Sequence, residues 1–229
     1  MKIGVICGFQ AEIDCFNKAI HAAHLDPQQF NIIPSGSSSA RAKEAAEHLA
    51  HEGCRKLLSF GIAGGLDSAL QVGDVVFSSH VVTTLDEAYG TPPPRKIENP
   101  PLRAGSRTVK GSICGVDEIV FTPREKATLF ATTKAAAADM ESHALAREAS
   151  KNGLPFFVLR AISDSSADTL PAYVANGVSH DGQPQIMPIL KGLAANPFSL
   201  PLLLRLKKNT DSALTALEAA AVRILPSLV

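Results

Sequence analysis

The sequence lacks an excess of charge of either sign. Lys plus Arg and Asp plus Glu number 22 each, so the formal net charge is zero. A basic excess is typical of nucleic-acid binding and an acidic run of a solvated, disordered tail, and the chain has neither. We therefore expect a small-molecule partner and no nucleic acid.

Cysteine is scarce and unpaired in the sequence. No CxxC pair occurs among the four cysteines, and the seven histidines show no metal-ligand spacing. Neither a zinc site nor a disulfide framework is predicted, and free, buried thiols in a reducing compartment are expected. The four cysteines are Cys7, Cys15, Cys54 and Cys114.

Long apolar runs are missing as well. The opening Met1-Lys2-Ile3-Gly4-Val5-Ile6 is too short for a signal sequence and lacks its cleavage pattern. No stretch approaches the length of an apolar membrane span. The expectation is a soluble, cytoplasmic protein.

What the sequence does contain is an alternation of strands and helices. Its 229 residues, 45% of them hydrophobic, predict one α/β domain over residues 1–229. The glycine-rich segment 61–65 is predicted as a turn, and residues 91–101, with five prolines, as an exposed loop. Strands are predicted over 2–7, 30–33, 56–60, 74–83, 111–116, 136–139 and 156–162. Helices are predicted over 11–23, 41–52, 141–152 and 197–225, with one more starting near residue 123.

Three carboxylates lie where such a fold places functional groups. Asp164 ends a buried strand, Glu141 opens a helix after a strand, and Glu12 follows the first strand. A desolvated Asp164 could protonate a leaving group, while an ionised Glu141 could accept hydrogen bonds from ribose hydroxyls. This pattern favours cleavage of the glycosidic bond of a nucleoside. The structural alternative is a set of ordinary turn, cap and first-turn acids.

Two further segments are weaker candidates. The glycines of 61–65 would give a ligand access to backbone amides, but the segment matches neither the Walker nor the dinucleotide pattern. Ser37-Ser38-Ser39 with Arg41 could bind an anion at a helix start, and a solvated helix cap is an equal alternative.

Taken together, these residues resemble the purine nucleoside phosphorylase and methylthioadenosine/adenosylhomocysteine nucleosidase superfamily. The resemblance covers nearly the whole chain in order. It is carried by Met1-Lys2-Ile3-Gly4, Glu12, Ala63-Gly64-Gly65-Leu66, Val72-Gly73-Asp74, Met140-Glu141 and Ser163-Asp164. Within the superfamily, the chain looks most like the hopanoid-associated phosphorylase branch, through residues 59–67, Asp139-Met140-Glu141-Ser142-His143 and Asn196-Pro197.

The resemblance implies a three-layer α/β/α fold with a mixed central sheet, no metal or organic cofactor, and a homodimer. It implies that Glu12 directs the nucleophile and that Asp164 protonates the purine at N7. Met140 and Glu141 would hold the ribose, and Ala63, Gly64, Ile119 and Val120 would lie against the base. The implied substrate is adenosylhopane. The alternatives are a methylthioadenosine/adenosylhomocysteine nucleosidase, a general purine nucleoside phosphorylase, and a catalytically silent nucleoside-binding protein.

One departure from the resembled family concerns phosphate. Ser59 and Ile62 stand where the phosphorylases hold phosphate with an arginine and a serine. A phosphate dianion needs charge-assisted donors, which this segment does not supply. Water is therefore the favoured nucleophile, with inorganic phosphate as the alternative and Arg41 as the candidate to bind it.

The C-terminal region, residues 165–229, is expected to supply a lid loop and a helical extension. A hopane tail requires an open apolar mouth, which the loop 165–188 and the leucine-rich segment 198–204 could form. Packing of that segment in the core or at a subunit interface is the favoured alternative. If the segment is exposed, Arg205, Lys207 and Lys208 beside it would suit peripheral contact with a membrane surface.

Overall fold

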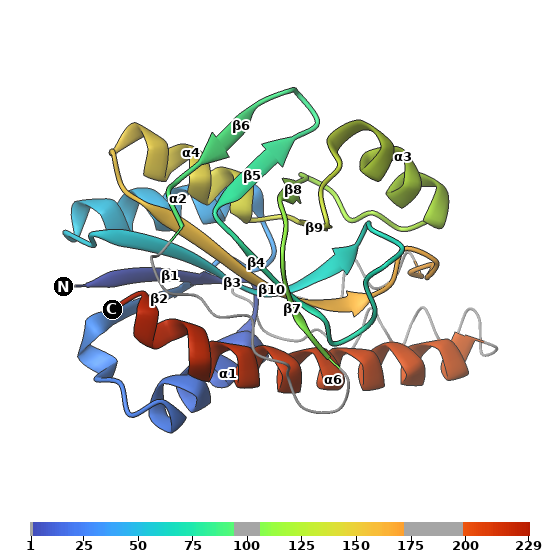
Figure 1. Cartoon of the computed structure of the whole chain (residues 1–229), viewed down its shortest axis with the longest axis horizontal. Helices are drawn as coiled ribbons and strands as arrows, with labels where there is room; N and C mark the ends of the chain where they lie inside the picture. The colour runs from blue at the N-terminus through green and yellow to red at the C-terminus, as the bar shows by residue number, and fades with distance from the viewer. Residues whose placement is uncertain (1, 94–105, 172–198) are drawn as a thin grey trace.

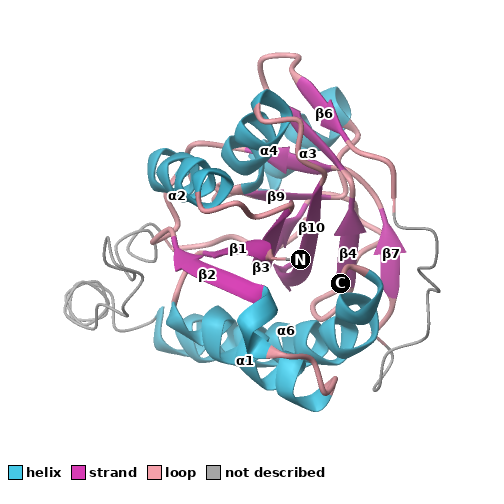
Figure 2. Cartoon of the chain, turned by 90° about the vertical axis from the view of Figure 1, so that its left-hand side faces the viewer, coloured by secondary structure: helices cyan, strands magenta, loops and turns pink. Residues whose placement is uncertain are grey.

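The computed structural model describes residues 2–93, 106–171 and 199–229. One mixed sheet lies between two layers of helices, with α1 and α6 on one face and α2 and α4 on the other (Figures 1 and 2). The predicted three-layer α/β/α fold is thus confirmed. The helices are α1 (Gln10–Ala22), α2 (Ser39–His51), α3 (Pro123–Thr133), α4 (Ser142–Lys151) and α6 (Leu200–Ile224).

Ten strands form the sheet in the described part of the chain. They are β1 (Ile3–Cys7), β2 (Phe30–Pro34), β3 (Lys56–Gly65), β4 (Val75–Ser78), β5 (His80–Thr83), β6 (Ala88–Gly90), β7 (Thr108–Lys110), β8 (Ile113–Gly115), β9 (Ala137–Asp139) and β10 (Phe156–Asp164). Most neighbours are parallel, while β10 with β4, β3 with β9 and β5 with β6 are antiparallel. The short strands β6 and β7 were not predicted from the sequence.

The long strand β3 organises the sheet. Its first half pairs with β1, its last two residues pair with β9, and β10 follows its other edge in parallel. The turn predicted over residues 61–65 is therefore wrong, because this glycine segment continues β3. Glycine suits a strand where another group must approach the backbone closely.

The predicted strand 74–83 is also divided. It breaks between Ser78 and His80 into β4, which pairs with β10, and β5, which pairs with β8. A valine-rich pattern could not reveal this change of partner, since both halves contain a pair of valines. Most of the loop predicted over 91–101 lies outside the described residues.

Two apolar clusters hold the layers together. One packs α1 and α6 on the sheet and includes Phe16, Phe60 and Leu217. The other packs α2 and α4 on the opposite face and includes Leu49, Leu57 and Leu145. All four cysteines are free and buried, as predicted.

The leucine-rich start of α6 does not belong to either cluster. Leu200 and Leu204 are 44% and 59% exposed, so the core alternative is wrong for these two residues. The helix enters the core only from Ala213 onwards. Residues 172–198, which include most of the predicted lid, lie outside the described part of the chain. Within that part, no helix is both long enough and apolar enough to cross a bilayer.

Candidate active site

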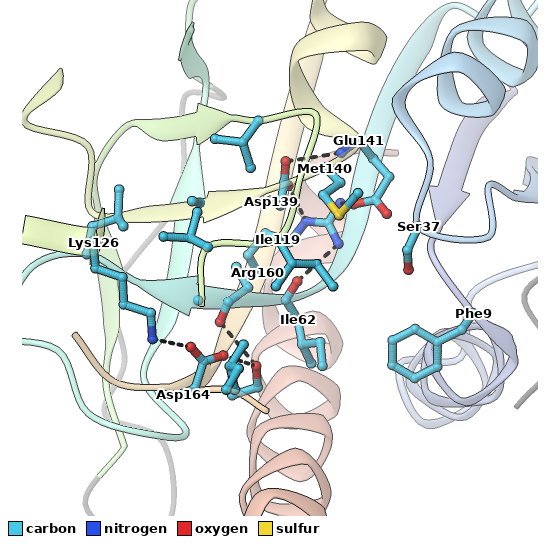
Figure 3. Close-up of a pocket in the computed structure, with 18 of the residues that line it drawn as sticks. Phe9, Ser37, Ile62, Ile119, Lys126, Asp139, Met140, Glu141, Arg160 and Asp164 are labelled. Carbon is cyan, nitrogen blue, oxygen red and sulfur yellow. Dashed lines mark hydrogen bonds and ion pairs between the residues drawn. The ribbon is translucent and has the colours of Figure 1, made fainter. Parts of the chain in front are cut away.

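A cavity of about 270 Å³ lies at the carboxyl ends of β3, β9 and β10, where the starts of α1 and α4 and the helix α3 meet them (Figure 3). This is the edge of an α/β sheet at which ligands bind. Eight residues that the sequence analysis assigned to catalysis or substrate binding line this cavity: Glu12, Ala63, Gly64, Ile119, Val120, Met140, Glu141 and Asp164. Their gathering is an observation, whereas their individual roles stay predictions.

Arg160 connects the acidic side of the cavity. Its Nη2 donates to Ser59 Oγ (2.6 Å) and to Glu141 Oε2 (2.9 Å), and its Nη1 donates to the Ile62 carbonyl (3.3 Å). Nε lies 2.6 Å from Asp139 Oδ2, a close ion pair without an aligned hydrogen bond. A buried guanidinium with this many acceptors is held in one orientation.

Glu12 is fixed by two backbone amides. Its Oε2 accepts from Gly8 N–H (2.6 Å) and its Oε1 from Ile62 N–H (2.7 Å). Glu12, in the first turn of α1, thus reaches back to the amide of Gly8, the residue before the N-cap Phe9. Burial raises the pKa of Glu12 to about 7, although Arg160, with Nη1 3.9 Å away, lowers it. The alternative of an ordinary exposed first-turn glutamate is excluded, since Glu12 is only 1% exposed.

Gly61 explains why this part of β3 is rich in glycine. A Cβ atom at Gly61 would lie 2.2 Å from Glu12 Oε1 and 2.3 Å from Arg160 Nη1. Both side chains therefore pass directly over the Cα atom. The absence of a side chain at this position is what lets the acid and the guanidinium meet.

Glu141 is oriented by its neighbour in the sequence. Asp139 Oδ1 accepts from the amides of Glu141 (3.3 Å) and Ser142 (2.9 Å), and Ser142 Oγ donates to Asp139 Oδ2. Asp139 thereby caps the start of α4 and turns Glu141 towards Arg160. Burial raises the pKa of Glu141, with Arg160 opposing the shift. Met140 lines the cavity beside it, as Figure 3 shows.

Asp164 lies across the cavity from this cluster, at the end of β10. Its Oδ2 accepts from Lys126 Nζ, and its Oδ1 accepts from Ser163 Oγ (3.0 Å). Burial raises the pKa of Asp164, while Lys126 opposes the shift. Gly64 lies beneath the carboxyl group, since a Cβ there would be 3.2 Å from Oδ2.

Three residues at the site were not identified from the sequence: Arg160, Lys126 and Asp139 in its role as a helix cap. Arg160 carried a usable signal, because a lone charge within an apolar strand must find buried partners. Lys126 carried none, because lysine is ordinary in a polar helix. Arg41 lies on α2 and is not among the described residues that line the cavity. No described cluster of three or more His, Cys, Asp or Glu side chains could hold a metal ion.

Similar proteins were found by sequence and by structure. The 5′-methylthioadenosine/S-adenosylhomocysteine nucleosidase of Shewanella oneidensis is 29% identical to this chain. The match covers 61% of this chain and 69% of the Shewanella protein. The enzyme of the same name from Lysinibacillus sphaericus is 26% identical, and the match covers 72% of this chain and 86% of that protein.

Solved structures share the fold over the whole chain. One is the 5′-methylthioadenosine/S-adenosylhomocysteine nucleosidase of Colwellia psychrerythraea in complex with adenine. It superposes with a TM-score of 0.70 at 20% identity, and the match covers 100% of this chain and 96% of that one. The futalosine hydrolase of Helicobacter pylori superposes with a TM-score of 0.59 at 18% identity, and the match covers 96% of this chain and 97% of that one. The family model described as phosphorylase superfamily matches residues 2–179, and the chain belongs to that superfamily.

Proposed function

We propose that this protein hydrolyses the N-ribosyl bond of a 5′-substituted adenine nucleoside and releases adenine. The observation that carries the proposal is the position of the carboxylates. Asp164 faces the cavity from the end of β10, and Glu141 faces it from the start of α4 on the other side (Figure 3). Glu12 lines the same cavity from the first turn of α1. A nucleoside between them would present its base to one acid and its sugar to the others.

Each carboxylate has a distinct task in this mechanism. Asp164, whose pKa is raised by burial, donates in its protonated form to N7 of adenine as the bond from the base to C1′ breaks. Glu141, ionised beside Arg160, accepts hydrogen bonds from the ribose hydroxyls. Glu12, with a pKa of about 7, takes a proton from the nucleophile as it attacks the anomeric carbon.

The charges favour water over phosphate as the nucleophile. Among the described residues, two cations line the cavity, and both already have partners. Arg160 contacts Glu141, Asp139 and Ser59. Lys126 contacts Asp164 and two backbone carbonyls. Ser59, at the position of the phosphorylase arginine, is itself buried under Arg160. Among the residues that the structure describes, a phosphate dianion would meet carboxylates without a free guanidinium or ammonium group to offset them.

The 5′ substituent is proposed to be the hopane of adenosylhopane. Support comes from the branch resemblance and from the exposed Leu200 and Leu204 on α6. Arg205 Nη2 lies 2.9 Å from Asp168 Oδ1, which ties this end of α6 to the loop that follows Asp164. Exposed leucines at this end of α6 suit a large apolar tail and would also suit lipid at a membrane surface. A homodimer remains a prediction.

A methylthioadenosine/adenosylhomocysteine nucleosidase is the second candidate. It is favoured by the names of the relatives that match in sequence. The two candidates share the ribose and adenine contacts, so the site chemistry does not separate them.

Incubation of the purified protein with adenosylhopane and with methylthioadenosine, each with and without phosphate, distinguishes these possibilities. Free adenine is the measurement. Adenine from adenosylhopane alone, without phosphate, is the expected result. Release mainly from methylthioadenosine would establish the second candidate, dependence on phosphate would overturn the choice of water, and no release from either would overturn the enzymatic proposal.

A further inference from the structure

Lys126 is a buried cation in a helix whose other residues are exposed or only partly buried. It is fully buried, and it is the only residue of α3 that is buried. Burial of an ammonium group is costly unless each of its protons has an acceptor. A lysine at this place therefore requires an explanation in terms of what it contacts.

The contacts of Lys126 match the three protons of an ammonium group. Nζ donates to Asp164 Oδ2, to the carbonyl of Ser165 (2.7 Å) and to the carbonyl of Asp168 (3.2 Å). Because each of its three protons is donated to one of these acceptors, Lys126 has no proton left for a ligand. Its ion pair occupies Oδ2 of Asp164 and leaves Oδ1, beside Ser163, as the oxygen available to a purine.

We propose that Lys126 is the positioning residue of the acid: it orients the Asp164 carboxyl group and stabilises the carboxylate that forms when Asp164 gives up its proton. This inference rests on the proposed function. In the step concerned, the proton on Asp164 Oδ1 moves to N7 of adenine. The C1′–N9 bond breaks with its electron pair on the base, and Asp164 is left as a carboxylate beside the Lys126 ammonium. Water attacks C1′ and loses a proton to Glu12; Glu12 then releases this proton to solvent, from which Asp164 takes one up.

The other charged groups near Asp164 do not replace Lys126. Asp168, on the loop that follows β10, is a like charge and acts to raise the pKa of Asp164. Arg205 of α6 pairs with Asp168 at 2.9 Å, and so offsets that charge. Strand β3 contributes Gly64 beneath the carboxyl group, which carries no charge. Lys126 is thus the cation that directly contacts Asp164 in the described chain.

The first test measures Asp164 without any need for turnover. The carboxyl group is titrated by carbon-13 NMR in aspartate-labelled protein and assigned with Asp164→Asn. In Lys126→Gln, which keeps an N–H donor but lacks the charge, the midpoint of Asp164 should move to higher pH. An unchanged midpoint would overturn the proposal, whether or not any nucleoside is cleaved.

The second test uses the leaving group. Lys126→Gln and Lys126→Met should lower kcat about 10- to 100-fold on the adenine nucleoside that the wild type cleaves, within the range of acid catalysis. They should have little effect on 4-nitrophenyl riboside, whose leaving group needs no proton. Equal losses on both substrates would indicate a purely structural role and contradict the proposal.

Two controls complete the design. In an Asp164→Asn background, Lys126→Gln should cause little further loss on the adenine nucleoside, because the acid that it serves is gone; additive losses would overturn the proposal. Lys56→Met removes another lysine that donates to a backbone carbonyl, that of Leu228, away from the cavity. It should leave both substrates and the Asp164 midpoint unchanged.

Discussion

Glu12 Oε1 accepts a hydrogen bond of 2.7 Å from the backbone N–H of Ile62, so the first turn of α1 is joined to the end of β3, fifty residues away. The bond holds a carboxylate in a place where burial raises its pKa. The same carboxylate has Gly8 N–H at its other oxygen and therefore cannot rotate freely. Position and proton affinity of this group are thus set by the same packing.

The first prediction concerns the pH dependence of the reaction. Glu12 must be ionised to accept a proton, and its pKa in the folded protein is about 7. The value of kcat/KM should therefore rise as the pH is raised through about 7, since the basic form accumulates above the pKa. A rising limb near 4.5, the ordinary value for glutamate, would show that Glu12 is not the base. Glu12→Gln should remove the limb together with most of the activity.

The second prediction concerns the glycine of β3. Gly61→Ala places a methyl group within 2.3 Å of both Glu12 and Arg160, which are buried and cannot move away without losing partners. We expect a loss of about 100-fold or more in kcat/KM, as for other displacements of about 1 Å in active sites. Gly90→Ala, whose Cβ would meet the His80 ring at 3.1 Å on the short strand β6, is the control and should retain activity. Retained activity in Gly61→Ala would contradict the described geometry.

The third prediction concerns stability. Arg160→Met leaves the carboxylates of Glu12, Asp139 and Glu141 without their shared cation, and breaking such a buried pair costs about 3–5 kcal/mol. Loss of the cation raises the pKa of Glu12 and Glu141 further, so the folded state of the variant binds more protons. Its free energy of unfolding, measured by denaturant titration, should therefore fall more steeply than that of the wild type from pH 5 to pH 8.

Arg147→Met provides the comparison for that experiment. Arg147 pairs with Glu87 at 2.6 Å, but both side chains are more than a third exposed. Such a pair contributes about 0–1 kcal/mol. A similar loss in both variants, independent of pH, would contradict the interpretation of Arg160 as the centre of a buried charge cluster.

The fourth prediction concerns the sugar. Glu141→Gln should weaken recognition of the ribose hydroxyls, so that the preference for a ribonucleoside over its 2′-deoxy analogue falls by about tenfold, equivalent to about 1.4 kcal/mol. Glu148→Gln is the matched control: a buried glutamate of the same helix, paired with Lys151 at 2.7 Å and outside the cavity lining. If both variants keep the wild-type preference, Glu141 does not hold the sugar.

The sequence by itself determined the order of most elements and the identity of the acids. Apolar runs ending in Asp164 and Asp139 predict strands that stop at carboxylates, and the helix starts at Glu12 and Glu141 follow from local pattern. These signals are local because strand burial and helix initiation depend on neighbouring residues.

Only the tertiary structure decided which charges meet. The glycine segment of β3 has the composition of a turn, yet its backbone pairs with β10 and β9 as a strand. Glycine is needed at position 61 because Glu12 and Arg160 pass over it. Lys126 looks like a surface residue in the sequence, and becomes the partner of Asp164 because its long side chain reaches from α3 to the end of β10. Contacts between residues far apart in the chain depend on how the elements pack, and local sequence patterns carry no record of that packing.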